Sequence, residues 1–323
     1  MQRHALLLTG AAPGKQYVEQ YAGWTDALYD ILTTEYGYAD DRLTALFGRG
    51  ADENDRIDGP CRLENIREEF QKLQHTTKHG DQVFICLIGQ STVSGRTVSG
   101  RTASDQSAKF NIIGPDITGE EFAALLATLP GRNVIVVNTT TVSAPFCRPL
   151  SGPGRIIISA TRSGTEKYDT RFPEYFIAAL KDRAADRDKN RRVSLWEALD
   201  YASRGVTESY EAQDRLPTEH ATLDDNGDGE FNVKPDPAQN DGQLAQIAFI
   251  DNTALQGDSE VPAELQALDA RRRELERNVT LLRSRKAELP EDKYQVQLES
   301  LLIELARVTR DLKSQQSELN DVP

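Results

Sequence analysis

Two polar residues stand at the ends of apolar runs, where an α/β enzyme would place its catalytic groups. Gln90 follows the run VFICLIG (83–89), and Thr140 comes shortly after the run VIVVN (134–138). Parallel strands carry such residues to one edge of a sheet, where α/β enzymes keep their chemistry. Glutamine is neither acid nor base near neutral pH, and a threonine hydroxyl needs a neighbouring base before it can attack a carbonyl group. The pair therefore lacks a proton acceptor.

The segment ADRDKNRRVSLWEA (185–198) has the spacing of a calcium loop of the EF-hand type. Oxygen donors fall at loop positions 1, 3, 5, 7, 9 and 12, in the order Asp186, Asp188, Asn190, the backbone carbonyl of Arg192, Ser194 and Glu197. Arg191 stands where a glycine normally permits the sharp turn, and its charge opposes cation binding. Calcium binding and a metal-free, capped loop before a helix are therefore equal alternatives.

A second acidic segment, LDDNGDGEF (223–231), is a weaker candidate for calcium. Its potential donors Asp224, Asn226 and Asp228 repeat the alternating spacing, but Pro235 stands where the closing glutamate should be. Because the bidentate ligand is missing, a structured turn is the favoured interpretation.

Alternating strands and helices must position these residues. Apolar runs predict strands at 4–11, 42–48, 83–88, 133–138 and 155–161, and helical periodicity predicts helices at 24–36, 61–77, 120–129, 172–180 and 195–212. This alternation predicts an α/β fold with a mostly parallel sheet of about six strands and helices on both faces. The segment 91–106 contains TVSGR twice and is expected to be a solvated, hairpin-forming loop.

From Pro262 onwards the composition changes to Leu, Glu, Arg and Gln, which predicts a separate helical element. Leucines recur seven residues apart in two series, Leu268, Leu275, Leu282 and Leu289, then Leu298, Leu305, Leu312 and Leu319. Heptads form a helix seam, and Pro290 separates the two series, so we expect an antiparallel helical hairpin, a short coiled coil. The hairpin either packs on its own globular domain or joins other subunits. The expected domains are 1–215, an acidic loop and linker at 216–261, and the hairpin at 262–323.

Composition limits the partners. The 323 residues carry a net charge of -13, which repels nucleic acid and anionic lipid, and the mean hydropathy of -0.55 argues against membrane insertion. Three cysteines, Cys61, Cys86 and Cys147, are too few for a disulfide framework or a zinc site. The expected compartment is the cytoplasm, or the periplasm or exterior if Met1 replaces a removed leader.

Several segments resemble the caspase and legumain superfamily, the clan CD cysteine peptidases, and most closely bacterial legumain-like C13 proteins. They are GDQVFICLIGQS (80–91), KFNIIGPDIT (109–118), VIVVNTTTVSAPF (134–146) and the stretch 151–180, within a resemblance that covers roughly 4–215. In that family one strand ends at the catalytic histidine and the next at the catalytic cysteine. By this resemblance Gln90 lies at the histidine position and Thr140 at the cysteine position.

The resemblance implies a caspase-hemoglobinase-like scaffold that has lost its catalytic pair. The expected function is that of a pseudopeptidase, without a required cofactor, that binds protein partners or assembles with itself through the hairpin. One alternative is a peptidase with an atypical nucleophile, Thr140 or Cys147; another is a structural subunit of a homo-oligomer. The four histidines, His4, His75, His79 and His220, lie away from the predicted strand ends, and Cys86 and Cys147 are expected to be buried and idle.

Overall fold

The structure is a computed structural model that describes residues 2–50, 54–94, 107–131, 133–251, 262–284, 286 and 289–320. The chain divides into two compact units, Met1–Asp251 and Asn252–Pro323. The repeated TVSGR segment falls mostly at 95–106, outside the described residues.

A mostly parallel sheet of seven strands forms the centre of the first unit, which confirms the predicted α/β class. Its spatial order is β10-β9-β8-β4-β1-β2-β3, and only β10 runs antiparallel to its neighbour. The strands are β1 (Arg3–Thr9), β2 (Leu43–Phe47), β3 (Gly59–Pro60), β4 (Gln82–Ile88), β8 (Val134–Asn138), β9 (Arg155–Ser159) and β10 (Thr222–Asp224). A small antiparallel sheet joins β5 (Ser91–Ser94), β6 (Ser107–Phe110) and β7 (Ile117–Thr118).

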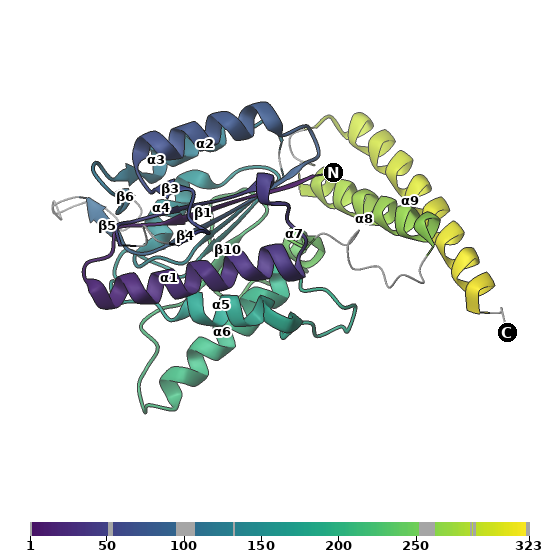
Figure 1. Cartoon of the computed structure of the whole chain (residues 1–323). Helices are drawn as coiled ribbons and strands as arrows, with labels where there is room; N and C mark the ends of the chain where they lie inside the picture. Colours follow the sequence, from purple (N-terminus) through teal and green to yellow (C-terminus); the bar gives the residue numbers. More distant parts are fainter. Residues whose placement is uncertain are drawn as a thin grey trace. The chain divides into compact units, whose positions relative to one another are not determined.

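Helices cover both faces of the main sheet (Figure 1). Helices α2 (Leu63–Thr76) and α3 (Gly119–Leu126) lie over one face, and α1 (Lys15–Asp30), α5 (Phe172–Leu180) and α6 (Leu195–Glu211) lie over the other. The short helix α4 (Ser143–Cys147) follows β8, and the short helix α7 (Gln243–Ile247) follows the second acidic segment. The sheet is therefore buried on both sides, as its continuous apolar strands predict.

Helix α1 begins well before the predicted helix at 24–36. It starts at Lys15 and continues through a π-helical turn, Ile31–Glu35. Packing stabilises these earlier turns: Tyr21 is buried and stacks on Trp24, with ring centroids 5.8 Å apart. Tyr21 lies before residue 24, so the helical periodicity of 24–36 does not include it.

Main chain from the small sheet crosses the carboxyl edge of the large one. The Asn111 carbonyl accepts from the Ala11 N–H at 2.9 Å, and the Asn111 N–H donates to the Gln90 carbonyl at 3.0 Å. A side chain at Gly10 would place its Cβ 2.4 Å from the Asn111 carbonyl oxygen, so only glycine permits this crossing. The segment thereby fixes the edge at which β1 and β4 end.

The segment 216–251, expected to be an acidic loop and linker, is built into the first unit. Strand β10 completes one edge of the sheet by pairing antiparallel with β9, Leu223 opposite Ile158. Three residues carry too little periodicity to predict a strand, and the surrounding aspartates favoured a loop. The globular unit therefore extends to Asp251 rather than ending at residue 215.

The second unit contains α8 (Ala263–Ser284) and α9 (Glu291–Asn320), which pack against each other as a hairpin. Arg271 on α8 is ion-paired with Glu304 on α9 at 2.5 Å, and Lys286 lies 4.0 Å from Glu291, so the helices run antiparallel. Of the predicted heptad leucines, Leu275, Leu282 and Leu312 are buried. The side chain of Leu319 lies outside the described part.

Within the described residues, no helix is both long enough and apolar enough to cross a membrane.

Candidate functional site

The parallel pairing of β4 with β8 brings the two predicted positions to the same edge of the sheet. Leu87 lies opposite Asn138 in the register, so Gln90 and Thr140 follow neighbouring strand ends, as the sequence predicts. Ser91, directly after Gln90, lies with its Oγ 2.6 Å from the Thr140 Oγ1. Contact between the two segments is thus made through Ser91.

Thr140 is completely buried, and its hydroxyl is fully engaged. The hydroxyl donates to the Asn138 Oδ1 at 2.7 Å, and the same oxygen accepts from the Thr140 N–H at 3.0 Å. On the other side lies the Ser91 hydroxyl, and Thr141 exchanges two hydrogen bonds with the Ser91 backbone. All of these partners are neutral, so none of them can take the proton that a nucleophilic hydroxyl must lose.

Gln90 is half-buried and turns to a different set of partners. Its Nε2 donates to the Asp169 Oδ1 at 3.1 Å, and the Tyr17 hydroxyl donates to the other oxygen of Asp169 at 2.6 Å. This hydrogen bond holds the pKa of Tyr17 above its ordinary value, because the phenol proton is bound by a carboxylate. The amide at position 90 therefore helps to hold the loop that carries Asp169.

The turn after Thr140 is strained. Val142 has a φ of 51°, in the left-handed region that β-branched residues avoid, at a cost of about 1–3 kcal/mol. It is buried, and its N–H donates to the Glu166 carbonyl at 3.2 Å before α4 begins. The surrounding structure therefore imposes the conformation of this edge.

The cysteines lie inside the core, as expected for Cys86 and Cys147. Burial raises the pKa of the Cys86 thiol and of the Cys147 thiol to about 12, and it also raises the pKa of Cys61. Cys147 is the last residue of α4. A thiol with such a pKa is protonated near neutral pH and is a poor nucleophile.

None of the histidines named here is a hydrogen-bond partner of Thr140, but His220 has a carboxylate partner that the sequence does not predict. His4 is buried near the start of β1, at the opposite end of that strand from the edge described above, and His75 lies in the last turn of α2. His220 lies in the loop before β10, and its Nδ1 lies 2.6 Å from the Oε1 of the buried Glu166. These residues are far apart in sequence, and no short motif announces their pairing.

The first acidic loop gathers the carboxylates that its spacing predicts. Oxygens of Asp186, Asp188 and Glu197 lie within 4.8 Å of one another. The Asn190 N–H donates to both aspartates, at 3.1 and 3.0 Å, and the Arg191 N–H donates to Asp186 at 2.8 Å. The loop is thus curled around a cluster of oxygens.

Three of the predicted ligand residues, Arg192, Ser194 and Glu197, also serve local structure. Arg191, which is not a predicted ligand, takes the conformation usually reserved for glycine, with a φ of 65°. Ser194 and Glu197 form a capping box at the start of α6, in which the Ser194 hydroxyl and N–H donate to Glu197. The Arg192 guanidinium forms a buried ion pair with Asp251 and lies 3.8 Å from the centre of the Phe249 ring. A capped turn and a cation loop share this geometry.

The second acidic segment is a structured turn. Asp224 is buried and accepts from the N–H groups of Gly227 and Gly229, at 2.9 and 3.1 Å, while Asn226 accepts from the Asp228 N–H at 2.8 Å. Glycine is needed at 227, where a Cβ would lie 2.7 Å from the backbone of Gly152. The ligand oxygens proposed from the sequence are therefore engaged in backbone hydrogen bonds.

Two neighbouring aspartates, not singled out in the sequence, anchor α7. Asp225 accepts from the N–H groups of Gly242 and Ala245 at 2.9 and 2.8 Å, and Asp241 accepts from the Asp225 N–H at 3.0 Å. Burial raises the pKa of Asp241 to about 6. At the other end of α7, the Ala248 carbonyl accepts from the Leu195 N–H at 3.0 Å. Helix α7 thus touches both acidic segments.

No protein-family model and no curated protein matches the sequence. The crystal structure of protein GSU0716 from Geobacter sulfurreducens aligns with 74% of this chain and 96% of its own, at 13% sequence identity and a TM-score of 0.44.

The buried hydroxyl of Thr140 is expected to stabilise the sheet edge. Thr140→Val keeps the shape but removes a donor to Asn138 and a partner of Ser91, so we expect the free energy of unfolding to fall by about 1–3 kcal/mol in urea denaturation. The matched change Thr76→Val, at an exposed hydroxyl on α2, should stay within about 0.5 kcal/mol of wild type. Equal stability of both variants would contradict this role.

Proposed function

We propose that this chain is a non-catalytic relative of the caspase and legumain-like peptidases that acts in protein binding or assembly. The observation that carries the proposal is the state of the sheet edge: the Thr140 hydroxyl is buried among neutral partners, and Gln90 is hydrogen-bonded to Asp169. The family itself is inferred from the segments that resemble it.

Chemistry disfavours the alternative of an active peptidase. A nucleophile of this kind needs a base within hydrogen-bond reach, and losing one member of such a pair already removes most of the rate enhancement. None of the hydrogen-bond partners of Thr140 among the described residues is such a base, and Cys147 is buried with a raised pKa. We infer that this sheet edge has kept the architecture of the peptidase family, and that Gln90 and Thr140 form structural hydrogen bonds there in place of a catalytic pair.

The purified protein is expected to be inert toward peptides and toward covalent probes. Iodoacetamide should leave all three cysteines unmodified under native conditions, because the thiols are buried and protonated, and should label all three in denaturant. Intact-mass measurement reads the labelling, and a broad peptide library with a hydroxyl-directed fluorophosphonate tests turnover. Cleavage accompanied by labelling at Thr140 or Cys147, and abolished in Thr140→Ala or Cys147→Ala, would establish the peptidase instead.

We also propose that the hairpin of the second unit is a surface for self-association. Helix α9 exposes three large apolar side chains, Val296 (68% exposed), Ile303 (46%) and Leu302 (40%). Val296 and Ile303 are seven residues apart and so share one face of the helix. Exposed apolar residues that cluster on one face favour contact with another protein over contact with water.

Charges placed on this face should weaken the association. Val296→Glu with Ile303→Glu is expected to shift the protein toward monomer, because a carboxylate in an apolar interface must lose its hydration. Analytical ultracentrifugation of the full chain across a concentration series measures the shift. The control pair Gln297→Glu with Ser300→Glu adds the same charge at exposed polar positions of α9. A monomeric wild type at the highest concentration, or an equal effect of the control pair, would contradict the proposal.

Calcium binding by the first acidic loop is a further proposal, supported by the convergence of Asp186, Asp188 and Glu197. These residues offer the hard oxygen donors that calcium prefers, and both aspartates come from a loop that is already curled. The ion would supply charge neutralisation and would fix the start of α6, at which Glu197 lies.

Calcium bound only to the folded state should raise the midpoint temperature of thermal unfolding. At a hundred times its dissociation constant, calcium should stabilise the protein by about 2.7 kcal/mol relative to a chelator, which for a unit of this size is a shift of about 5–10 °C. Asp188→Asn should abolish the shift, whereas Asp228→Asn, the matched change in the second acidic segment, should leave it intact. Identical melting of the wild type with calcium and with chelator would contradict calcium binding.

A further inference from the structure

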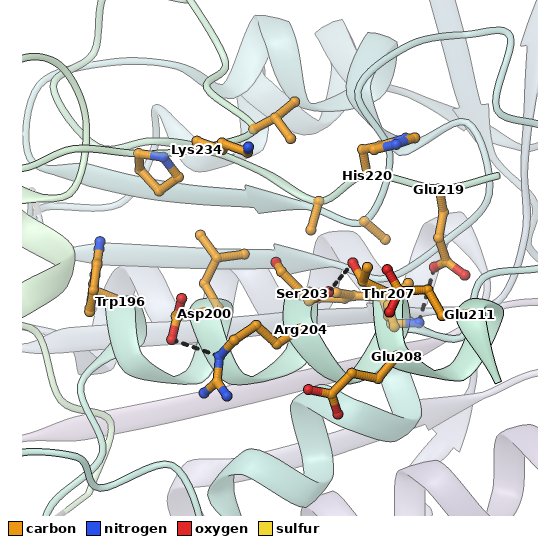
Figure 2. Close-up of a pocket in the computed structure, with 17 residues that line it drawn as sticks. Trp196, Asp200, Ser203, Arg204, Thr207, Glu208, Glu211, Glu219, His220 and Lys234 are labelled. Atoms are coloured by element: carbon orange, nitrogen blue, oxygen red, sulfur yellow. Dashed lines mark hydrogen bonds and ion pairs between the residues drawn. The ribbon is translucent and has the colours of Figure 1, made fainter. Parts of the chain in front are cut away.

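A cavity of about 570 Å³ lies beside α6, and Thr140 does not line it. Its lining runs along α6 from Trp196, in the first turn, to Glu211, the last residue, a length of roughly 22 Å at about 1.5 Å per residue. Figure 2 shows the chain around Lys234 and His220 on the other side, over different ends of the helix. The cavity is therefore an elongated groove, and its volume falls in the range of ligand sites, roughly 300–1,000 Å³.

The backbone of β10, the last strand of the main sheet, alternates between an inner and an outer side. Leu223 exchanges both of its backbone hydrogen bonds with Asn232, at 3.0 and 2.9 Å, on the outer side. Two residues further on, the Asp225 N–H also donates outward, to the Asp241 carboxylate at 3.0 Å. By the same alternation, Ala221 directs its N–H and carbonyl groups to the outer side.

The outer side of β10 is open at Ala221. The N–H of its neighbour His220 donates to Glu166, in the loop that follows β9, at 3.1 Å, so His220 faces inward and Ala221 outward. After Asn232 the chain bends and leaves the strand. Within the described residues, neither the N–H nor the carbonyl group of Ala221 forms a hydrogen bond.

These open groups belong to a buried residue at the cavity. Ala221 is only 6% exposed, and it lines the cavity. A buried backbone N–H or carbonyl group without a partner costs about as much free energy as a lost hydrogen bond, so nearly all such groups in proteins have one. The partner that satisfies both groups at once is the backbone of another extended chain, which adds a strand to the sheet.

The floor of the cavity is apolar and has room for side chains. Phe172, Leu199 and Val206 line it and are buried. The register of β10 with β9 continues to Ala221 opposite Ala160, which also lines the cavity, and neither alanine fills the space beside α6. Alternate side chains of an added strand would point to one face, so an apolar one among them would displace water from this floor.

Carboxylates outnumber cations in the lining. Glu208 and Glu211, in the last turn of α6, are exposed, and neither has an ion pair among the described residues. Of the two lysine and arginine side chains that line the cavity, Arg204 is paired with Asp200 at 3.1 Å, and Lys234 stands over the other end of α6 (Figure 2). In a protein with a net charge of -13, this end of the cavity favours a basic side chain over an acidic one.

We propose that this cavity binds an extended peptide segment of a partner protein, which pairs with β10 at Ala221 and carries an apolar and a basic side chain two residues apart. The two backbone hydrogen bonds of Ala221 would fix the strand. The apolar side chain would pack on the floor of the cavity, and the basic one would lie near Glu208 and Glu211. The site is separate from the edge at Thr140 and from the hairpin, so the proposal goes beyond the function proposed above.

Calorimetric titration of the full-length protein with a capped peptide, two copies of Thr-Leu-Thr-Arg, tests the proposal. A matched peptide with glutamate in place of arginine should bind about tenfold more weakly, because its charge is repelled. N-methyl groups on the threonines, or instead on the leucines and arginines, remove the donors from one side of the strand at a time. We expect one of these two peptides to lose about tenfold in affinity and the other to stay within about threefold, because only one side pairs with Ala221.

Variants of the protein locate the binding. Ser203→Phe, at a half-buried position of the cavity wall on α6, should fill the space and abolish binding. Glu208→Lys with Glu211→Lys should remove the preference for the arginine peptide over the glutamate peptide. The control pair Glu64→Lys with Glu68→Lys, at exposed positions of α2, should preserve it. A thermal melt of each variant confirms that it is folded, and the N-methylated peptides test the proposal on the wild type alone.

Four results would each overturn the proposal. They are equal losses with the two N-methylated peptides, equal affinity for the arginine and glutamate peptides, binding that survives in a folded Ser203→Phe variant, and no saturable binding of the arginine peptide. A control pair that removes the charge preference as fully as the pair on α6 would also overturn it.

Discussion

The parallel pairing of β4 with β8 is the constraint on which the carboxyl edge of the sheet depends. Both strands are buried along their whole length, so their backbone groups must pair with each other and their ends must coincide. This register leaves little choice for the residues that follow: Ser91 meets Thr140, and the polar groups there must satisfy one another in the absence of water. The strand register therefore determines which side chains meet at this edge, and the residue types determine only which hydrogen bonds they can then form.

Much of this architecture could be predicted from local patterns. Apolar runs predicted β4 and β8 to within a residue, and their neighbourhood followed from the alternation of strands and helices. Position alone could not reveal what Gln90 and Thr140 contact, because Asp169 and Asn138 reach them through loop and turn geometry. Strand β10 escaped prediction since three residues among aspartates carry no periodic signal.

The same limit explains the features found only in the structure. His220 and Glu166 belong to two loops that are distant in sequence and that the fold brings into contact. The cavity beside His220 is lined by α6 and the segment after β10. In the first acidic loop the sequence predicted which oxygens converge. It could not separate a capping role from a metal-binding one, because Glu197 satisfies backbone donors in the very place where a calcium ligand would stand.

Helix α7 is only five residues long, yet its two ends are tied to different acidic segments. Asp225 holds its amino end, and the chain after its carboxyl end pairs with the backbone at Ser194 and Leu195, where α6 begins. The two acidic segments are therefore not independent surface loops, because a continuous set of backbone and aspartate hydrogen bonds joins them through α7.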